Sequence, residues 1–268
     1  MDAEVILLGL LQGVTEFLPV SSSGHLALAK ILMGSGDLSL AFDLILHVST
    51  LMAVLIYFFR DISSLLVEWL YGFVNANARR WDGWRFGWAV IVGSCMTVPI
   101  AIFLKPLISD ASSNMLILGG DFWITALLLL SAKFLKVSNH PVRIKNGAFV
   151  GFVQGFAVLP GISRSCTTIW AGLFSGLSRD EAFRFSFLLS IPAILGAALF
   201  EARELGGYLE FVNALPSDWF LASIVAFVSG FFSLVLLRRL VTSDKWWLFF
   251  LYCAVLGCVS AVYSIIGV

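Results

Sequence analysis

The sequence has few charged residues, and these are balanced in sign. Only 13% of its 268 residues are charged, and 17 Lys and Arg residues oppose 17 Asp and Glu residues, which gives a formal net charge of zero. This balance excludes the broadly basic surface with which proteins bind nucleic acid. The first residues lack the basic start of a secretory signal peptide, so we expect no cleaved leader.

Cysteine is also scarce and forms no recognisable motif. The four cysteines, Cys95, Cys166, Cys253 and Cys258, lie in apolar stretches without CxxC spacing. Such a pattern argues against a disulfide framework and against a zinc site. We therefore interpret the cysteines as packing residues.

Hydrophobic residues, by contrast, are abundant. They make up 59% of the chain, and the mean hydropathy is +0.95, well above the composition of soluble domains. The composition predicts an all-α polytopic protein with one integral membrane domain over residues 1–268 and no soluble appendage. Because a spanning helix needs about 20 apolar residues, we expect six spans, at roughly 40–59, 86–104, 115–132, 183–200, 219–237 and 246–267.

Two further apolar stretches are interrupted. Residues 3–33 are broken at "FLPVSSSG" and residues 147–177 at "VLPGISRS". Each half holds only about 10–16 residues, too few to cross a hydrocarbon core about 30 Å thick. Pro and Gly at the breaks interrupt helical hydrogen bonds that lipid cannot replace. We expect each stretch to form a re-entrant helical hairpin with its tip enclosed by protein.

The loops of this predicted topology differ in positive charge. One side carries most of the basic residues, among them Arg79, Arg80 and Lys133, whereas the other carries Lys30, Lys105 and Arg203. The richer side is expected to be cytoplasmic by the positive-inside rule. Both termini would then lie outside, and the two hairpins would enter the membrane from opposite faces.

An internal repeat fits this topology. Sliding the sequence along itself aligns Leu18-Pro19 with Leu159-Pro160, and the same shift aligns Ser22 with Ser163 and Ser49 with Ser190. We expect an inverted-topology repeat, with repeat 1 over roughly residues 1–132 and repeat 2 over roughly residues 146–268. This plan brings broken helices together at the midplane of a membrane protein.

Glu16 and Arg164 are charged residues at the two breaks. A charge inside a membrane needs a partner or a wet cavity. One reading is a structural ion pair that locks the two repeats together. The other is a catalytic carboxylate beside an anion-binding guanidinium.

Hydroxyl groups surround both charges. Ser21, Ser22 and Ser23 precede one helical pattern, and Ser163, Ser165, Thr167 and Thr168 flank Arg164. Such serines are typical helix caps, but the same helix starts also bind phosphate. With the forked donors of arginine, the two helix starts would form a diphosphate cradle.

Further polar residues share helical faces with these groups. His25 lies three residues after Ser22 and would activate its hydroxyl, or else be a hydrogen-bonded core group. Gln12 and Glu16 are four residues apart and would position substrate, water or a divalent cation such as Mg²⁺ or Ca²⁺, with Glu16 as the metal ligand. For Asp43 and His47, also four apart, we favour a structural role over one that supports the site.

Two stretches resemble a known family. "QGVTEFLPVSSSGH" and "PGISRSCTTIWAGLFSGLSRDEAFRFSFLLSIPAILGA" are similar to the signature regions of the undecaprenyl-diphosphate phosphatase family of the bacitracin-resistance type. The resemblance extends along nearly the whole chain. It implies hydrolysis of undecaprenyl diphosphate to undecaprenyl phosphate, which recycles the lipid carrier for peptidoglycan synthesis and confers bacitracin resistance. It also implies a multi-pass enzyme of the bacterial inner membrane whose active site opens toward the outer face.

The resemblance assigns roles by position. It implies that Glu16, Ser22, His25 and Arg164 are catalytic, and that Gln12, Ser21, Ser23, Ser163, Ser165 and Thr168 bind the substrate or its phosphates. Two departures from the family pattern stand out. Gln12 leaves one carboxylate where the family can have two, and Cys166 replaces the glycine of "SRSG". A side chain there would narrow the cradle or oppose a positive φ.

A transporter or flippase of a polyprenyl phosphate lipid is the alternative function. Inverted repeats with broken helices are the usual architecture of transporters, and fold alone does not decide function. A homodimer is compatible with either function, and the sequence leaves open whether Ser22 or water attacks the phosphorus.

Overall fold

The computed structural model describes residues 3–33, 39–204 and 208–266. These residues form helices and no β-strand. Six helices are long and apolar enough to cross a membrane, which confirms the predicted polytopic all-α class. They are α3 (Leu40–Tyr57), α5 (Asp82–Ser113), α6 (Met115–Ala132), α9 (Arg179–Glu204), α11 (Trp219–Thr242) and α12 (Phe249–Ile266), the last extended at its start by the 3₁₀ turn η2 (Trp246–Leu248).

The two interrupted stretches form pairs of short helices. The first pair is α1 (Ala3–Phe17) and α2 (Ser22–Met33), and the second is α7 (Ile144–Phe156) and α8 (Arg164–Phe174). The 15 residues of α1 extend only about 22 Å, less than the thickness of a hydrocarbon core of about 30 Å. The helices of each pair pack against each other.

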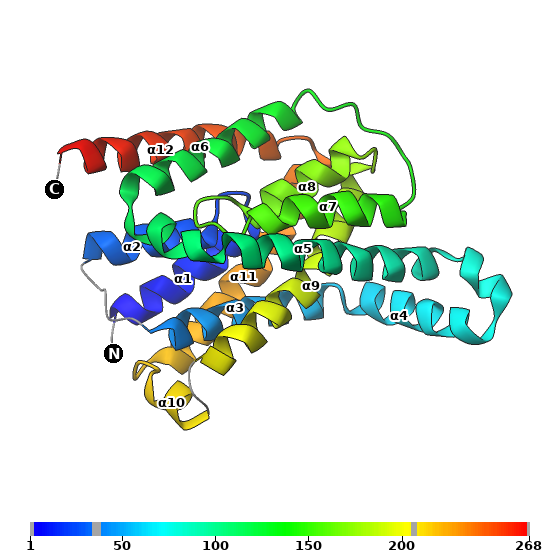
Figure 1. Ribbon diagram of the computed structural model, residues 1–268, viewed down its shortest axis with the longest axis horizontal. Coiled ribbons are helices and arrows are strands. Elements are labelled where there is room, and N and C mark those ends of the chain that lie inside the picture. The colour runs from blue at the N-terminus through cyan, green and yellow to red at the C-terminus, as the bar shows by residue number, and fades with distance from the viewer. Residues whose placement is uncertain (1–2, 34–38, 205–207, 267–268) are drawn as a thin grey trace.

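The long helices hold these pairs in a reciprocal pattern. Helix α1 packs along α11, α7 packs along α5, and α6 packs along α12 (Figure 1). In each half of the chain, a long helix thus packs against the first short helix of the other half. Two repeats related by a twofold axis would pack in this way, although the repeat itself stays a prediction.

Small residues allow these contacts. A Cβ atom on Gly9 would lie 2.5 Å from the carbonyl oxygen of Ala222 in α11, and one on Gly151 would lie 2.0 Å from that of Gly93 in α5. The helix backbones therefore approach too closely for a side chain at these positions. Such small-residue seams are typical of helices packed within membranes.

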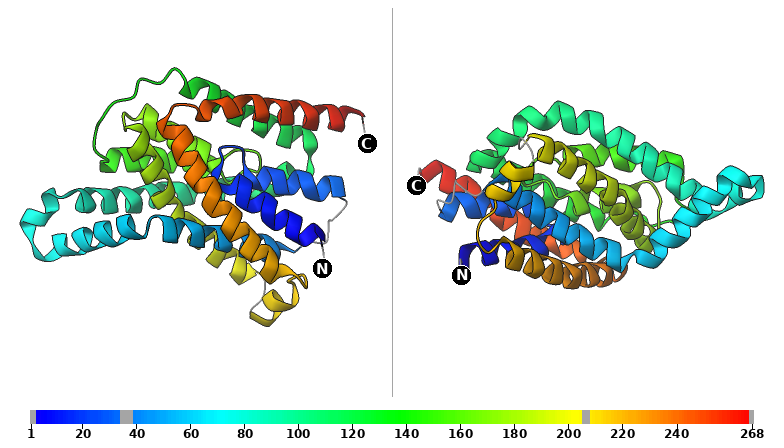
Figure 2. Two further views of the ribbon diagram at one scale, coloured as in Figure 1. Left: turned by 180° about the vertical axis from the view of Figure 1, so that it is seen from behind. Right: turned by 90° about the horizontal axis from the view of Figure 1, so that it is seen from below.

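Helix α4 (Phe59–Val74), the 3₁₀ helix η1 (Ala76–Arg80) and the start of α5 project from one end of the bundle (Figures 1 and 2). Helix α5 extends beyond the predicted span 86–104 at both ends: its first turn packs on α4 in this projection, and the helix continues to Ser113. The short helix α10 (Tyr208–Asn213) precedes α11.

Candidate active site

The breaks in the two helix pairs touch each other. The amide N of Gly161 donates a hydrogen bond to Ser21 Oγ (3.0 Å), and Ser165 Oγ donates to the Leu18 carbonyl (3.2 Å). Thr125 of α6 donates to the Gly161 carbonyl (2.7 Å) and accepts from the amide of Ser163 (3.0 Å). Hydrogen bonds therefore join the breaks of the two helix pairs and connect the second break to α6.

At each break, one residue has a positive φ, in the left-handed region of backbone conformation. Ser21 has φ 68° and Gly161 has φ 97°. Glycine adopts this conformation freely, whereas for serine it is strained. A Cβ atom on Gly161 would also lie 2.6 Å from Cβ of Asp121, so the second tip needs glycine for both reasons.

Glu16 and Arg164 form an ion pair across this junction, between Oε1 and Nη2. The Glu16 side chain is only 2% exposed and that of Arg164 is 19% exposed. The sequence predicted that these two charges would share one pocket, and the structure brings them together. Each charge thus has the oppositely charged partner that a charge in a low-dielectric interior requires.

Polar groups from three helices lie close to the other carboxylate oxygen of Glu16, Oε2. Gln12 Nε2 donates to Oε2 at 2.9 Å and Ser22 Oγ at 2.5 Å. The Nε2 atom of His47, on α3, lies 3.7 Å from the same oxygen. Glu16 therefore lies at the centre of these contacts, and the Ser22 hydroxyl donates its hydrogen bond directly to the carboxylate.

His25 has different partners. Its Nδ1 lies 2.7 Å from the Ser21 carbonyl and its Nε2 2.8 Å from the hydroxyl of Tyr252 on α12. A carbonyl oxygen only accepts hydrogen bonds, so Nδ1 carries a proton, and in the neutral ring Nε2 accepts from Tyr252. Both ring nitrogens are thus occupied away from Ser22, whose hydrogen bond goes to Glu16 instead.

The remaining predicted residues line the two helix starts. Ser163 caps α8 by accepting from the Cys166 amide (3.3 Å) and lies 3.2 Å from Ser165 Oγ. Thr168 Oγ1 is 2.5 Å from the hydroxyl of Ser186, and Ser23 Oγ is 3.4 Å from that of Ser21. These residues lie at or next to the starts of α2 and α8, the helices that follow the two breaks.

Cys166, which replaces the family glycine, lies in the first turn of α8. A helical residue does not need a positive φ. Its side chain is fully buried, with Sγ 3.9 Å from the Thr125 carbonyl. The cysteine therefore fits without backbone strain.

One atom of the site has no partner. Gln12 is fully buried and its Oε1 makes no hydrogen bond. An unpaired buried oxygen is costly unless a ligand or water binds it. Within the parts of the chain that the structure describes, no group of three His, Cys, Asp or Glu residues is arranged to hold a metal, so Gln12 and Glu16 would need substrate oxygens to complete a cation site.

Sequence reasoning missed two residues. The spacing of Asp43 and His47 favours a structural role for His47 over one that supports the site, and the sequence gives no signal for Tyr252. In the structure His47 faces Glu16, while Tyr252 binds His25 from more than two hundred residues away. No local pattern signals the second contact.

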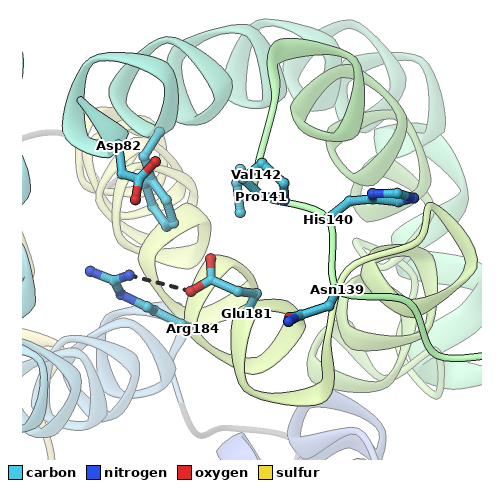
Figure 3. Close-up of a pocket in the computed structure, with 8 residues that line it drawn as sticks. Asp82, Asn139, His140, Pro141, Val142, Glu181 and Arg184 are labelled. Carbon is cyan, nitrogen blue, oxygen red and sulfur yellow. Dashed lines mark hydrogen bonds and ion pairs between the residues drawn. The ribbon is translucent and has the colours of Figure 1, made fainter. Parts of the chain in front are cut away.

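A crevice elsewhere offers a weaker candidate site. It has a volume of about 210 Å³ and is lined by residues of α5, α9 and the loop before α7, among them Asp82, Glu181 and Arg184 (Figure 3). Arg184 pairs with Asp61 (2.7 Å) and Glu181 (3.5 Å), and Asp82 pairs with Arg85 (2.6 Å). His140 points away from the opening. The carboxylates are thus already neutralised, and none of the predicted site residues lies there.

Comparison with known proteins places the chain in a family. A family model described as "Bacitracin resistance protein BacA" matches residues 5–259. An undecaprenyl-diphosphatase of Desulforapulum autotrophicum is 37% identical over 96% of each chain. That of Methanosphaera stadtmanae is 34% identical over 97% of each chain, and that of Mycobacterium tuberculosis is 39% identical over 91% of this chain and 90% of the relative. The chain therefore belongs to the BacA family of bacitracin resistance proteins.

Proposed function

We propose that this protein is a membrane phosphatase that hydrolyses undecaprenyl diphosphate to undecaprenyl phosphate and inorganic phosphate. The observation that carries the proposal is the Glu16–Arg164 ion pair with the Ser22 hydroxyl on the same carboxylate. The names of the relatives support the same reaction. By returning the lipid carrier to peptidoglycan synthesis, this activity would also account for bacitracin resistance.

The residues at the two helix starts would bind the phosphates. Arg164 would bind the terminal phosphate through its forked donors, together with the hydroxyls of Ser163, Ser165 and Thr168. Ser21 and Ser23 would lie at the other helix start, whose amides favour phosphate. The diphosphate would thus be held between two helix N-termini.

Ser22 is positioned as the nucleophile. Its Oγ would attack the terminal phosphorus while its proton passes to Glu16 Oε2, 2.5 Å away, and the bond to the prenyl phosphate would break. Water would then release phosphate from Ser22. His25, fixed by Ser21 and Tyr252, would orient the start of α2. A phosphoryl group found on Ser22 after rapid acid quench would distinguish this route from direct attack by water.

Phosphate release tests the function. We expect the protein, purified in detergent, to release inorganic phosphate from a long-chain prenyl diphosphate, because the site combines a nucleophile, a base and an anion-binding guanidinium. The measurement is colorimetric phosphate detection. A protein that moves the lipid between leaflets of vesicles without releasing phosphate would contradict this function and favour the transporter alternative.

Removal of divalent cations is expected to lower this rate. Gln12 Oε1, which has no partner, and Glu16 would hold Mg²⁺ or Ca²⁺ with the help of substrate oxygens, the usual ligand set of such ions at phosphate sites. When bound, the cation would neutralise charge on the diphosphate. Phosphate release measured with a chelator, and again after addition of each metal, tests this. Full activity in excess chelator would argue against the cation.

The arrangement in the membrane is also a proposal. We propose that α1–α2 and α7–α8 are re-entrant hairpins in an inverted repeat, with both termini outside the bacterial inner membrane. The reciprocal packing of α1 on α11 and α7 on α5 supports the repeat, and the distribution of Lys and Arg supports the orientation. Impermeant labelling of a terminal tag in intact cells tests the orientation.

A further inference from the structure

A second crevice lies where three candidate spans begin or end, and we call it the span-end crevice. It has a volume of about 400 Å³, and the residues that line it are Tyr57, Asp180, Val235, Arg238, Arg239 and Thr242. The span of α3 ends at Tyr57, that of α11 ends at Thr242, and that of α9 begins one residue before Asp180. These three helices pack against one another. Because the ends of spans lie at the level of the lipid headgroups, a phospholipid headgroup can reach the span-end crevice.

One positive charge in the span-end crevice has no protein partner. Arg238 donates to Oδ1 of Asp180 from both Nε (3.3 Å) and Nη2 (3.1 Å), and so compensates the carboxylate of the crevice. Arg239 is exposed, and within the described segments its guanidinium forms no hydrogen bond or ion pair. The charge of Arg239 is therefore left uncompensated in the span-end crevice.

Two hydrogen-bond donors of the span-end crevice are available to an anion. Arg239 offers a planar fork of N–H groups, which matches the oxygens of a phosphate. Tyr57 accepts a hydrogen bond from Nη1 of Arg238 at 3.3 Å, and no residue in the described part of the chain accepts the proton of its hydroxyl. The Thr242 hydroxyl is already used, because it donates to the carbonyl of Arg238 at 2.9 Å. A guanidinium and a phenol thus remain to bind phosphate oxygens.

An apolar stripe on α11 leads to Arg239. Phe232 and Leu236 lie seven and three residues before Arg239, so the three side chains share one face of the helix. Phe232 is 67% exposed and Leu236 is 46% exposed, and both lie in a candidate span, where exposed apolar side chains contact acyl chains. A free phosphate ion makes no use of this stripe. A phospholipid, by contrast, places its phosphate at Arg239 and an acyl chain along Phe232 and Leu236.

We propose that the span-end crevice binds an anionic phospholipid, with its phosphate on Arg239 and Tyr57 and one acyl chain along the stripe of α11. Charge favours an anionic over a zwitterionic lipid. The carboxylate of Asp180 is already paired with Arg238, so the ammonium group of a zwitterionic headgroup gains no partner there, whereas Arg239 still lacks a countercharge. None of the residues assigned to the candidate active site lines this crevice, and the inference does not depend on the proposed phosphatase function.

The substitution Arg239→Gln tests this proposal, because glutamine removes both the charge and the forked donors. The full chain is purified in detergent, freed of lipid and titrated with phosphatidylglycerol, and native mass spectrometry measures the bound fraction. We expect the variant to bind phosphatidylglycerol roughly 5- to 10-fold more weakly than the wild type, since one arginine near an anionic headgroup contributes about that factor. Arg80→Gln, at an exposed arginine of η1, is the matched control and is expected to keep the wild-type affinity.

Two further ligands identify the chemistry of the occupant. Phosphatidylcholine is expected to bind the wild type more weakly than phosphatidylglycerol does. Equal affinities of Arg239→Gln and Arg80→Gln for phosphatidylglycerol would overturn the proposal, and so would equal affinities of the wild type for the two lipids. Binding of inorganic phosphate that depends on Arg239, without Arg239-dependent binding of phosphatidylglycerol, would assign the crevice to a free anion and also overturn it. None of these measurements requires turnover, so they test the lipid site whether or not the protein releases phosphate from a prenyl diphosphate.

Discussion

The substitution Arg164→Lys is expected to lower phosphate release by roughly 10²- to 10³-fold, even though lysine keeps the positive charge. The guanidinium of Arg164 has donors enough to contact Glu16 and phosphate oxygens together, whereas an ammonium is a single point charge. The measurement is the steady-state rate of phosphate release from a long-chain prenyl diphosphate in detergent.

Lysine is preferred to alanine here for a physical reason. Arg164→Ala would leave Glu16 buried without its countercharge, a loss that typically costs about 3–5 kcal/mol of stability, and a drop in activity would then be ambiguous. Arg80→Lys is the matched control, because Arg80 is exposed in η1, at the projecting end of the molecule. An Arg164→Lys variant as active as this control would rule out the assigned phosphate-binding role.

The second large effect is expected from Glu16→Gln, which should reduce phosphate release by roughly 10²- to 10⁴-fold. Glutamine has nearly the same shape as glutamate but cannot take the proton that Ser22 presents at 2.5 Å. The same assay measures this loss. Size-exclusion chromatography of the variant establishes whether it stays folded.

The double variant Glu16→Gln, Arg164→Lys sharpens this prediction. Because the two side chains contact each other, their effects should not be additive, and the double variant should lose less activity than the two single losses multiplied. Strictly additive losses would show that the pair does not act as a unit. Near-normal activity of Glu16→Gln alone would remove Glu16 from the mechanism.

The parts of the fold that depend on local chemistry could be predicted from the sequence. Apolar run length identified all six spans, and Pro19 and Pro160 marked the ends of α1 and α7 because proline cannot continue helical hydrogen bonding. Pro99 and Pro106, by contrast, lie inside α5 without ending it. Helix α5 packs against α4 through its first turns and against α7 further along, and patterns within one segment do not predict these contacts.

The candidate site, like the fold, could be predicted only where local chemistry decides the contact. Glu16, Ser22 and Arg164 could be predicted because charged and hydroxyl groups at helix breaks are costly in a membrane without partners. The partners of His25 and His47 could not. Spacing predicts contacts along one helix, whereas Tyr252 of α12 binds His25 of α2, and His47 of α3 lies near Glu16 of α1.

The reciprocal packing of α1 on α11 and of α7 on α5 has a consequence for biogenesis. Helix α1 leaves the ribosome well before α11 (Trp219–Thr242), whose residues pack against Gly9 and Gly13. A nascent chain that stops after its first half would hold Glu16 without Arg164. The candidate site therefore assembles only when the second half of the polypeptide has entered the membrane.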